Sequence, residues 1–172
     1  MYQKLMSTIL VSILIGGCSS AGIKSVGNES SPITITNFKD GLIEFDENNK
    51  PRIYQEGDTF PYKENGKCVA ANQKHSCQWR GFEFDYESPY EITKFDCVAI
   101  SNRKQDYAYP DRYVGKNSKS SKWGFIVKGK SGHYIRPQYS FGITDKPLHI
   151  TFMCSHEGIE VLNWKVSLLP QG

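Results

Sequence analysis

Runs in which apolar and polar residues alternate recur along most of the chain. The clearest of these runs are Ile33–Phe38, Trp79–Tyr86 and Leu148–Cys154. Alternation with a period of two places every second side chain on the same face, so each run predicts a β-strand with one buried face. No stretch of ten or more residues shows the 3.6-residue period of a helix. The chain is therefore expected to be all-β.

Turn-forming residues divide the chain into short pieces. The 15 glycines and 8 prolines accompany an aromatic content of 13%, a balance typical of many short strands joined by turns. About eight to ten strands at this spacing predict a β-sandwich, immunoglobulin-like or similar.

Four segments carry more specific expectations. Lys39–Gly41 is expected to turn the chain between two strands, and Gly129–Gly132 is expected to do the same in a second hairpin. Phe95–Ser101 is nearly continuously apolar, which favours a central strand. Residues 102–122 are polar, basic and aromatic at once, and are expected to form the longest loop.

The last apolar run contains one residue that does not fit a regular strand. Asn163 falls on the otherwise apolar face of Ile159–Leu168. A β-bulge near Asn163 is expected, because one extra residue moves Trp164, Val166 and Leu168 onto the core side.

The N-terminal residues read as a targeting signal. Lys4 is followed by the apolar run Leu5–Ile15, which is too short to span a bilayer as a permanent helix. Leu14–Ser20, with two small residues before Cys18, resembles the lipobox of bacterial lipoprotein precursors. The resemblance implies cleavage before Cys18, attachment of a diacylglycerol to its thiol and acylation of its new amine. An ordinary cleaved signal peptide with a chance cysteine is the alternative.

This resemblance divides the chain into three parts. Residues 1–17 are the expected signal peptide, residues 18–32 a flexible tether that carries the lipidated Cys18, and residues 33–172 a single β-sandwich domain. The Ser-, Gly- and Asn-rich tether reaches up to about 45 Å at about 3.3 Å per residue. Ser19 lacks the aspartate that resembles an inner-membrane retention signal, so the resemblance implies the outer membrane, with the domain facing the periplasm.

The remaining cysteines suggest disulfides. Four are left once Cys18 is lipidated, namely Cys68, Cys77, Cys97 and Cys154. An even number in an exported chain predicts two disulfides. Three connectivities are possible, and we favour Cys68–Cys77, across a short loop, with Cys97–Cys154, between two strand-like runs.

Charge and motifs argue against nucleotides and nucleic acids. The chain has 21 basic and 18 acidic residues, and loss of Lys4 leaves a formal charge of +2, too weak to favour nucleic acid. Gly124–Ser131 matches the letters of a P-loop, but a P-loop needs a helix after its Lys-Ser pair, whereas strand-like residues follow here. No cofactor is expected.

Catalysis and metal binding have little support in the sequence. The chain contains neither a Gly-x-Ser-x-Gly elbow nor a His-Glu-x-x-His motif. Asp96, inside an apolar strand, and His133 are the residues on which an enzyme acting on cell wall or glycan would be tested. His75 and His156 lie near cysteines but lack the spacing of a known zinc site, so the four histidines are expected in solvated turns and no metal is expected.

One segment has the composition of a protein interface. Tyrosine, tryptophan and arginine are enriched at interfaces, and lysines around them favour an acidic partner. The candidate partner-binding residues are Tyr107, Tyr109, Arg112, Tyr113, Lys116, Lys119, Lys122 and Trp123. The alternative is a tyrosine-rich edge strand that packs on the domain itself, beside a solvated lysine-rich loop.

Together these features favour a lipid-anchored envelope protein that works by binding another protein, such as an immunity protein or an inhibitor. An accessory component of an envelope or secretion assembly is the second possibility. An enzyme acting on cell wall or glycan, and a lipid or small-molecule binder, are the competing classes.

Overall fold

The computed structural model describes residues 32–70, 72–109, 112–140 and 146–170, with the backbone alone for residues 70, 106–109 and 112–116. Within these ranges the chain forms ten strands and no helix, which confirms the all-β prediction. The strands are β1 (Thr34–Phe45), β2 (Pro51–Glu56), β3 (Thr59–Pro61), β4 (Gly66–Ala70), β5 (Gln73–Glu87), β6 (Ile92–Tyr109), β7 (Arg112–Lys128), β8 (Ser131–Ser140), β9 (Leu148–His156) and β10 (Ile159–Leu169).

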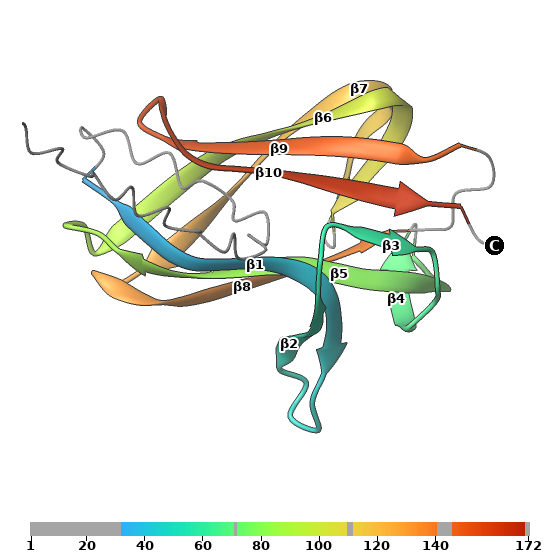
Figure 1. Ribbon diagram of the computed structural model, residues 1–172, viewed down its shortest axis with the longest axis horizontal. Helices are drawn as coiled ribbons and strands as arrows, with labels where there is room; N and C mark the ends of the chain where they lie inside the picture. Colours follow the sequence, from blue (N-terminus) through green and yellow to red (C-terminus); the bar gives the residue numbers. More distant parts are fainter. Residues whose placement is uncertain (1–31, 71, 110–111, 141–145, 171–172) are drawn as a thin grey trace, which may run out of the picture.

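The strands form two sheets stacked face to face, as in a β-sandwich (Figure 1). The first sheet has the order β2-β1-β5-β4, and β5 also pairs with β8. β4 pairs with residues 73–77 of β5 and β8 with residues 78–87. The second sheet has the order β3-β10-β9-β6-β7, with only β3 parallel to its neighbour. β6 has a neighbour on each side, as predicted for Phe95–Ser101.

The core lies between the two sheets and is rich in aromatic residues. On β5, Phe82 and Phe84 are 1% and 0% exposed, whereas the alternating carboxylates of that strand lie on the outer face. The ring of Phe125 on β7 stacks on that of Tyr134 on β8, with the ring centroids 4.7 Å apart. Because these two strands belong to different sheets, this contact joins the layers. Burial of each phenylalanine contributes about 1.5–3 kcal/mol.

Two predicted turns are corrected by the structure. Lys39–Gly41 does not end a strand, because β1 continues to Phe45 through an irregularity between Thr36 and Lys39, where Asn37 has a φ of 52°. Gly129, with a φ of 90°, is in a turn as predicted. That turn connects β7 of the second sheet to β8 of the first, so it is a crossing between layers and not a hairpin.

The predicted loop over residues 102–122 is also wrong. Apart from the undescribed residues 110 and 111, this region belongs to β6 and β7, which pair with each other as far as Tyr109 and Arg112. The strands are 18 and 17 residues long, longer than the short strands predicted. A ribbon of two strands needs no apolar face of its own where it leaves the sheet, so no alternation marks it in the sequence.

The predicted bulge in the last strand is present, but it is displaced. The register with β9 shifts between Glu160 and Leu162, ahead of Asn163. Trp164, Val166 and Leu168 then face the core, at 4%, 6% and 8% exposed.

One of the two predicted disulfides is formed. Cys97 of β6 and Cys154 of β9 are directly opposite in register and bonded, with their Cα atoms 4.1 Å apart. Cys68 and Cys77 are free thiols, both buried. They lie diagonally across β4 and β5, since Cys68 is opposite His75 and Cys77 is opposite Gly66.

A buried ion pair holds the segment between β2 and β3 to the first sheet. Arg80 Nη2 lies 3.3 Å from Asp40 Oδ2 and donates to the carbonyl of Gly57 at 3.4 Å. The guanidinium also lies over the ring of Phe60, at 5.1 Å from its centroid. Burial raises the pKa of Asp40 to about 7, against the attraction of Arg80.

We expect the Cys97–Cys154 bond to stabilise the domain chiefly by constraining the unfolded chain. It spans 57 residues, which corresponds to about 4 kcal/mol in the chain-entropy model. The double substitution Cys97→Ala with Cys154→Ala should lower the free energy of unfolding in urea by that order. Reductant should then shift the unfolding midpoint of the parent more than that of the double variant. Equal shifts would contradict the expectation.

We expect stability to fall as pH rises toward neutrality. Because the pKa of Asp40 is raised from 3.8 to about 7, its contribution is complete below the unfolded value and is lost as pH rises through the folded value. The slope is at most about 1.4 kcal/mol per pH unit. Asp40→Asn should flatten it in urea unfolding between pH 4 and 7, whereas Glu47→Gln, at an exposed turn, should not. An unchanged slope in Asp40→Asn would refute this assignment.

Candidate functional site

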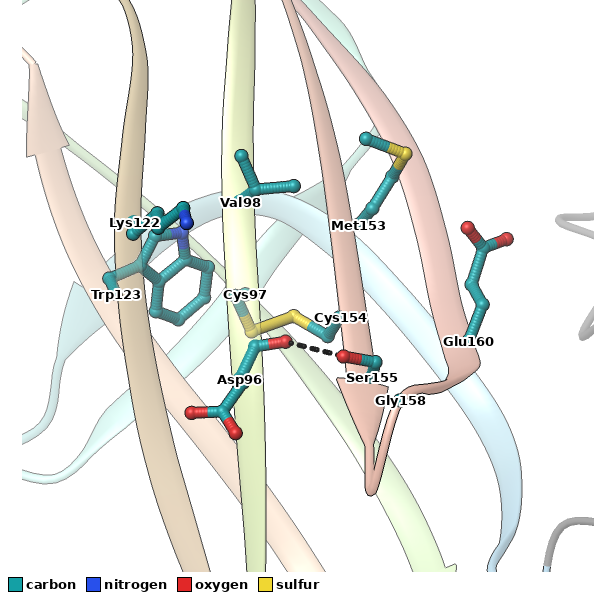
Figure 2. A pocket seen from close by; sticks show the side chains of 10 residues that line it. All are labelled: Asp96, Cys97, Val98, Lys122, Trp123, Met153, Cys154, Ser155, Gly158 and Glu160. Carbon is teal, nitrogen blue, oxygen red and sulfur yellow. Dashed lines mark hydrogen bonds between the residues drawn. A yellow bond between two sulfur atoms is a disulfide. The ribbon is translucent and has the colours of Figure 1, made fainter.

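The outer face of the second sheet carries an open hollow. Figure 2 shows the side chains of Lys122, Val98 and Met153 in one row across β7, β6 and β9, which agrees with the register of these strands. The Cys97–Cys154 disulfide lies at the same place and ties β6 to β9. The outward side chains around the hollow are those of Asp96, Val98, Lys122, Met153, Ser155 and Glu160.

The hollow has an apolar centre and charged residues at its margin. Asp96 Oδ1 lies 2.9 Å from Lys94 Nζ, and both side chains are about two-thirds exposed, at 67% and 66%. Ser155 Oγ donates to the carbonyl of Asp96 at 3.2 Å (Figure 2). At the far side, Asn163 Nδ2 donates to Glu160 Oε1 at 3.2 Å. Asp96 is thus a solvated ion-pair partner and not the buried acid considered from the sequence.

Large apolar side chains are also exposed on the same face of the sheet, outside the lining of the hollow. On the outer face of β6 and β7, Ile92, Ile100 and Ile126 are 63%, 45% and 52% exposed. β7 is the edge strand of the sheet. An apolar centre with a polar margin is the usual anatomy of a protein interface, and a strand with a free edge can accept a further strand.

β6 and β7 continue as a ribbon beyond the rest of the sheet. β9 pairs with β6 only from Asp96 to Ser101, and β7 is the only described partner of β6 beyond that point. The backbone of Asn102 and of the residues after it is therefore held by one neighbouring strand. In Figure 1 the ribbon arches at the end of the domain away from the start of β1.

The base of this ribbon is fixed by side-chain hydrogen bonds. The guanidinium of Arg103 donates to the carbonyl of Lys146 at 2.9 Å, and Asn102 accepts from the backbone N–H of His149 at 3.1 Å. The hydroxyl of Ser101 donates to the carbonyl of Arg103 at 2.6 Å. These contacts orient the ribbon relative to β9.

The structure places the predicted partner-binding residues on these two strands. The pairs Tyr107 with Gly115 and Tyr109 with Arg112 lie in the ribbon. The side chains of Tyr107, Tyr109, Arg112, Tyr113 and Lys116 lie outside the described part. Lys119 and Lys122 are exposed, and Lys122 also lines the hollow.

Trp123 is placed differently from its sequence interpretation. It is 9% exposed, and its ring belongs to the core beside Phe82 and Phe125. The guanidinium of Arg136 lies over it, 5.0 Å from a ring centroid. Lys122 points outward, so the next residue of the strand must point inward. Trp123 therefore packs in the core beneath the outer face of β7 and is not part of the exposed surface.

The histidines lie in strands and not in the turns expected for them. His133 Nδ1 of β8 is 2.9 Å from Asp85 Oδ1 of β5. Hydrogen bonds from Asn37 and then from His133 hold the pKa of Asp85 below its ordinary value. The ring nitrogens of His133 lie near the carboxylates of Glu83 and Asp85. His156 is 8% exposed, with Nδ1 2.9 Å from the carbonyl oxygen of Lys94.

No group of three or more histidine, cysteine or acidic residues in the described ranges is arranged to hold a metal ion. In the same ranges there is no helix with the length and apolar character to cross a bilayer.

The sequence interpretation missed the outward isoleucines of β6 and β7. The run Phe95–Ser101 is nearly continuously apolar in the sequence, although only alternate residues of it are buried in the structure. In a β-strand, residues an odd number of positions apart face opposite sides. Ile92 and Ile100 are five and three positions from the buried Cys97, so the sequence places them on the outer face.

Comparison with known proteins gives no relative from which a role can be transferred: no protein-family model matches the chain, and no curated protein matches it.

Proposed function

We propose that the chain is a lipid-anchored protein of the bacterial cell envelope that acts by binding another protein, as an immunity protein or an inhibitor does. The observation that carries this proposal is the β6–β7 ribbon, which runs past its neighbouring strand β9 and has an interface-like sequence.

The ribbon is better suited to recognition than to supporting the fold. Two strands without a third neighbour are marginally stable in water, so this extension adds little to the domain alone. The ribbon nevertheless contains three tyrosines and an arginine, namely Tyr107, Tyr109, Arg112 and Tyr113. These residue types supply large contact areas with polar handles and are enriched among binding hot spots.

The partner surface extends from the ribbon onto the sheet. Lys122 is exposed beside the hollow, and Lys119 is exposed where β7 enters the ribbon. Their charge supports an acidic partner and faster encounter at low salt. The apolar residues Val98 and Met153 beside Lys122 would supply the desolvated centre of the interface.

The anchor is proposed from the lipobox-like residues. Lipidation of Cys18 after removal of residues 1–17 would place the domain on the outer membrane, facing the periplasm. Several acyl chains on one cysteine would hold it stably, where one chain would not. Residues 18–32 would then act as the tether.

An oxidising compartment supports a second disulfide. Cys68 and Cys77 are buried on the paired strands β4 and β5. Each thiol donates to a backbone carbonyl of the facing strand, that of His75 at 3.8 Å and that of Gly66 at 4.0 Å. Burial raises the pKa of both thiols. We include the Cys68–Cys77 bond in the proposal for the exported protein.

The strand order supports an immunoglobulin-like sandwich as the finer fold class. β1, β5 and β8 would correspond to strands A, B and E of that fold. β10, β9, β6 and β7 would correspond to G, F, C and C′. β2, β3 and β4 would then be insertions between the first two strands.

We expect the ribbon to carry the affinity for the partner. The full chain with a C-terminal tag, solubilised from membranes, should retain a partner at a fixed stoichiometry. Tyr109→Ala combined with Arg112→Ala should lower the retained amount at least tenfold, because hot-spot truncations cost about 2 kcal/mol or more. Raised salt should also lower it.

The matched control lies on the β1–β2 hairpin. Tyr54→Ala with Arg52→Ala removes the same residue types from exposed β2 and should leave retention unchanged. Equal recovery by both double variants would disprove the ribbon assignment. Recovery of several membrane proteins, with loss of their function when the chain is deleted, would favour the accessory-component role.

We expect one mass measurement to test the anchor and the disulfides together. Protein extracted from membranes with free thiols blocked should begin at Cys18 and carry the mass of its acyl groups. It should incorporate no blocking agent before reduction and four equivalents after it. A chain of unmodified mass would refute the anchor, and two blocked thiols at Cys68 and Cys77 would refute the second disulfide alone.

A further inference from the structure

The start of the described domain and three of its turns lie at one end of the sandwich. Thr34, the first residue of β1, is opposite Glu87, the last residue of β5. The crossing from β5 to β6, the crossing from β7 to β8 and the β9–β10 turn lie at this end as well (Figure 1). We call it the tether end, because the chain enters the described domain here, through Pro32 and Ile33.

The tether end exposes large apolar side chains. Six large hydrophobic residues of the described ranges are exposed, and three of them lie here: Tyr90, Ile92 and Ile126, at 39%, 63% and 52%. Tyr90 covers the buried ring of His156, at 5.5 Å between centroids. Ile92 and Ile126 are diagonal neighbours on the outer face of β6 and β7.

Lysines alternate with these isoleucines. Across the two strands, Ile92 is opposite Lys128 and Ile126 is opposite Lys94. Each of these two cross-strand pairs therefore combines one apolar and one basic side chain on the same small surface. Long lysine side chains lay their methylene groups along an apolar surface while the ammonium group stays in a polar layer.

We propose that the tether end rests on a phospholipid surface, with Tyr90, Ile92 and Ile126 at the boundary between headgroups and acyl chains. This inference rests on the lipid anchor of the proposed function. It adds a second contact of the domain itself and gives the molecule a defined orientation on the membrane.

The length and position of the preceding chain favour a lipid occupant. Fourteen residues, Ser19 to Pro32, separate the proposed anchor from Ile33, a reach of at most about 45 Å. They join the domain at the same end as the exposed apolar residues. A surface tethered at this distance is at high effective concentration, so a contact too weak to bind membranes by itself is sufficient.

The charges at the tether end also suit a membrane better than a charged protein. Lys94 is paired with Asp96 at 2.9 Å, and Lys130 lies 3.9 Å from Glu91. The mixture of signs selects neither an acidic nor a basic partner. This separates the tether end from the lysine-bearing part of β7 that we assign to the protein partner.

The orientation has a consequence for recognition. β6 begins with Ile92 at the tether end and runs to the opposite end, where Asn102 contacts the start of β9. A domain that rests on lipid through its tether end therefore presents the β6–β7 ribbon away from the membrane.

A tryptophan reporter in the lipidated full chain tests the contact. Tyr90→Trp should be quenched in vesicles of phosphatidylcholine with brominated acyl chains, measured as the difference from the unsubstituted chain. Tyr54→Trp, at an exposed residue of β2, is the matched control and should not be quenched. Ile92→Ser with Ile126→Ser should reduce the quenching at position 90 at least twofold, whereas Val69→Ser on β4 should not.

Each contrary result identifies what fails. Absence of quenching at position 90, in a chain that sediments with the vesicles and retains its partner, overturns the lipid contact and leaves the proposed function intact. Equal quenching at positions 90 and 54 overturns the defined orientation. If the tryptophan fluorescence at position 90 changes when the protein partner is added and does not change when lipid is added, the surface binds protein and not lipid. Failure to sediment overturns the anchor and this contact together.

Discussion

The contact between aromatic rings of the two layers is the interaction on which the rest of this structure depends. Phe125 stacks on Phe95 within the second sheet and on Tyr134 of the first, with 4.7 Å between centroids in both cases. Phe82 and Phe84 fill the remaining space from β5. Because these residues alternate with solvent-facing ones, burying them fixes the register of every strand that carries them.

The same packing decides which surfaces are free for recognition. With Cys97 and Trp123 directed into the core, their neighbours Val98 and Lys122 must face outward. The disulfide to Cys154 then holds β6 against β9 up to Ser101. Beyond that residue β7 is the only described strand that pairs with β6, so the backbone of the ribbon is held by this one pairing.

The domain also keeps polar groups in its interior where the segment between β2 and β3 joins the two sheets. Arg80 reaches Asp40 on β1 and the carbonyl of Gly57, and Gln78 donates to the carbonyl of Pro61 at 3.1 Å. β3 in turn pairs with β10. A buried ion pair costs desolvation energy that its attraction offsets only in good geometry, so this arrangement is better explained by positioning than by added stability.

Alternation of side chains was enough to predict the all-β class, the buried face of β5 and the inward direction of Trp164, because these depend on local period and composition. The number of cysteines left three pairings open, and the tertiary structure decided that Cys97 bonds Cys154. The loop expected over residues 102–122 and the hairpin expected at Gly129 were wrong, because strand pairing between distant segments leaves no local signature. Only the tertiary structure decided that Trp123 is core while Lys122 is surface, that Asp96 is solvated, and that Ile92 and Ile126 gather where the chain enters the domain. These properties belong to the relation between strands, which is set by the packing of the whole core and not by any one segment.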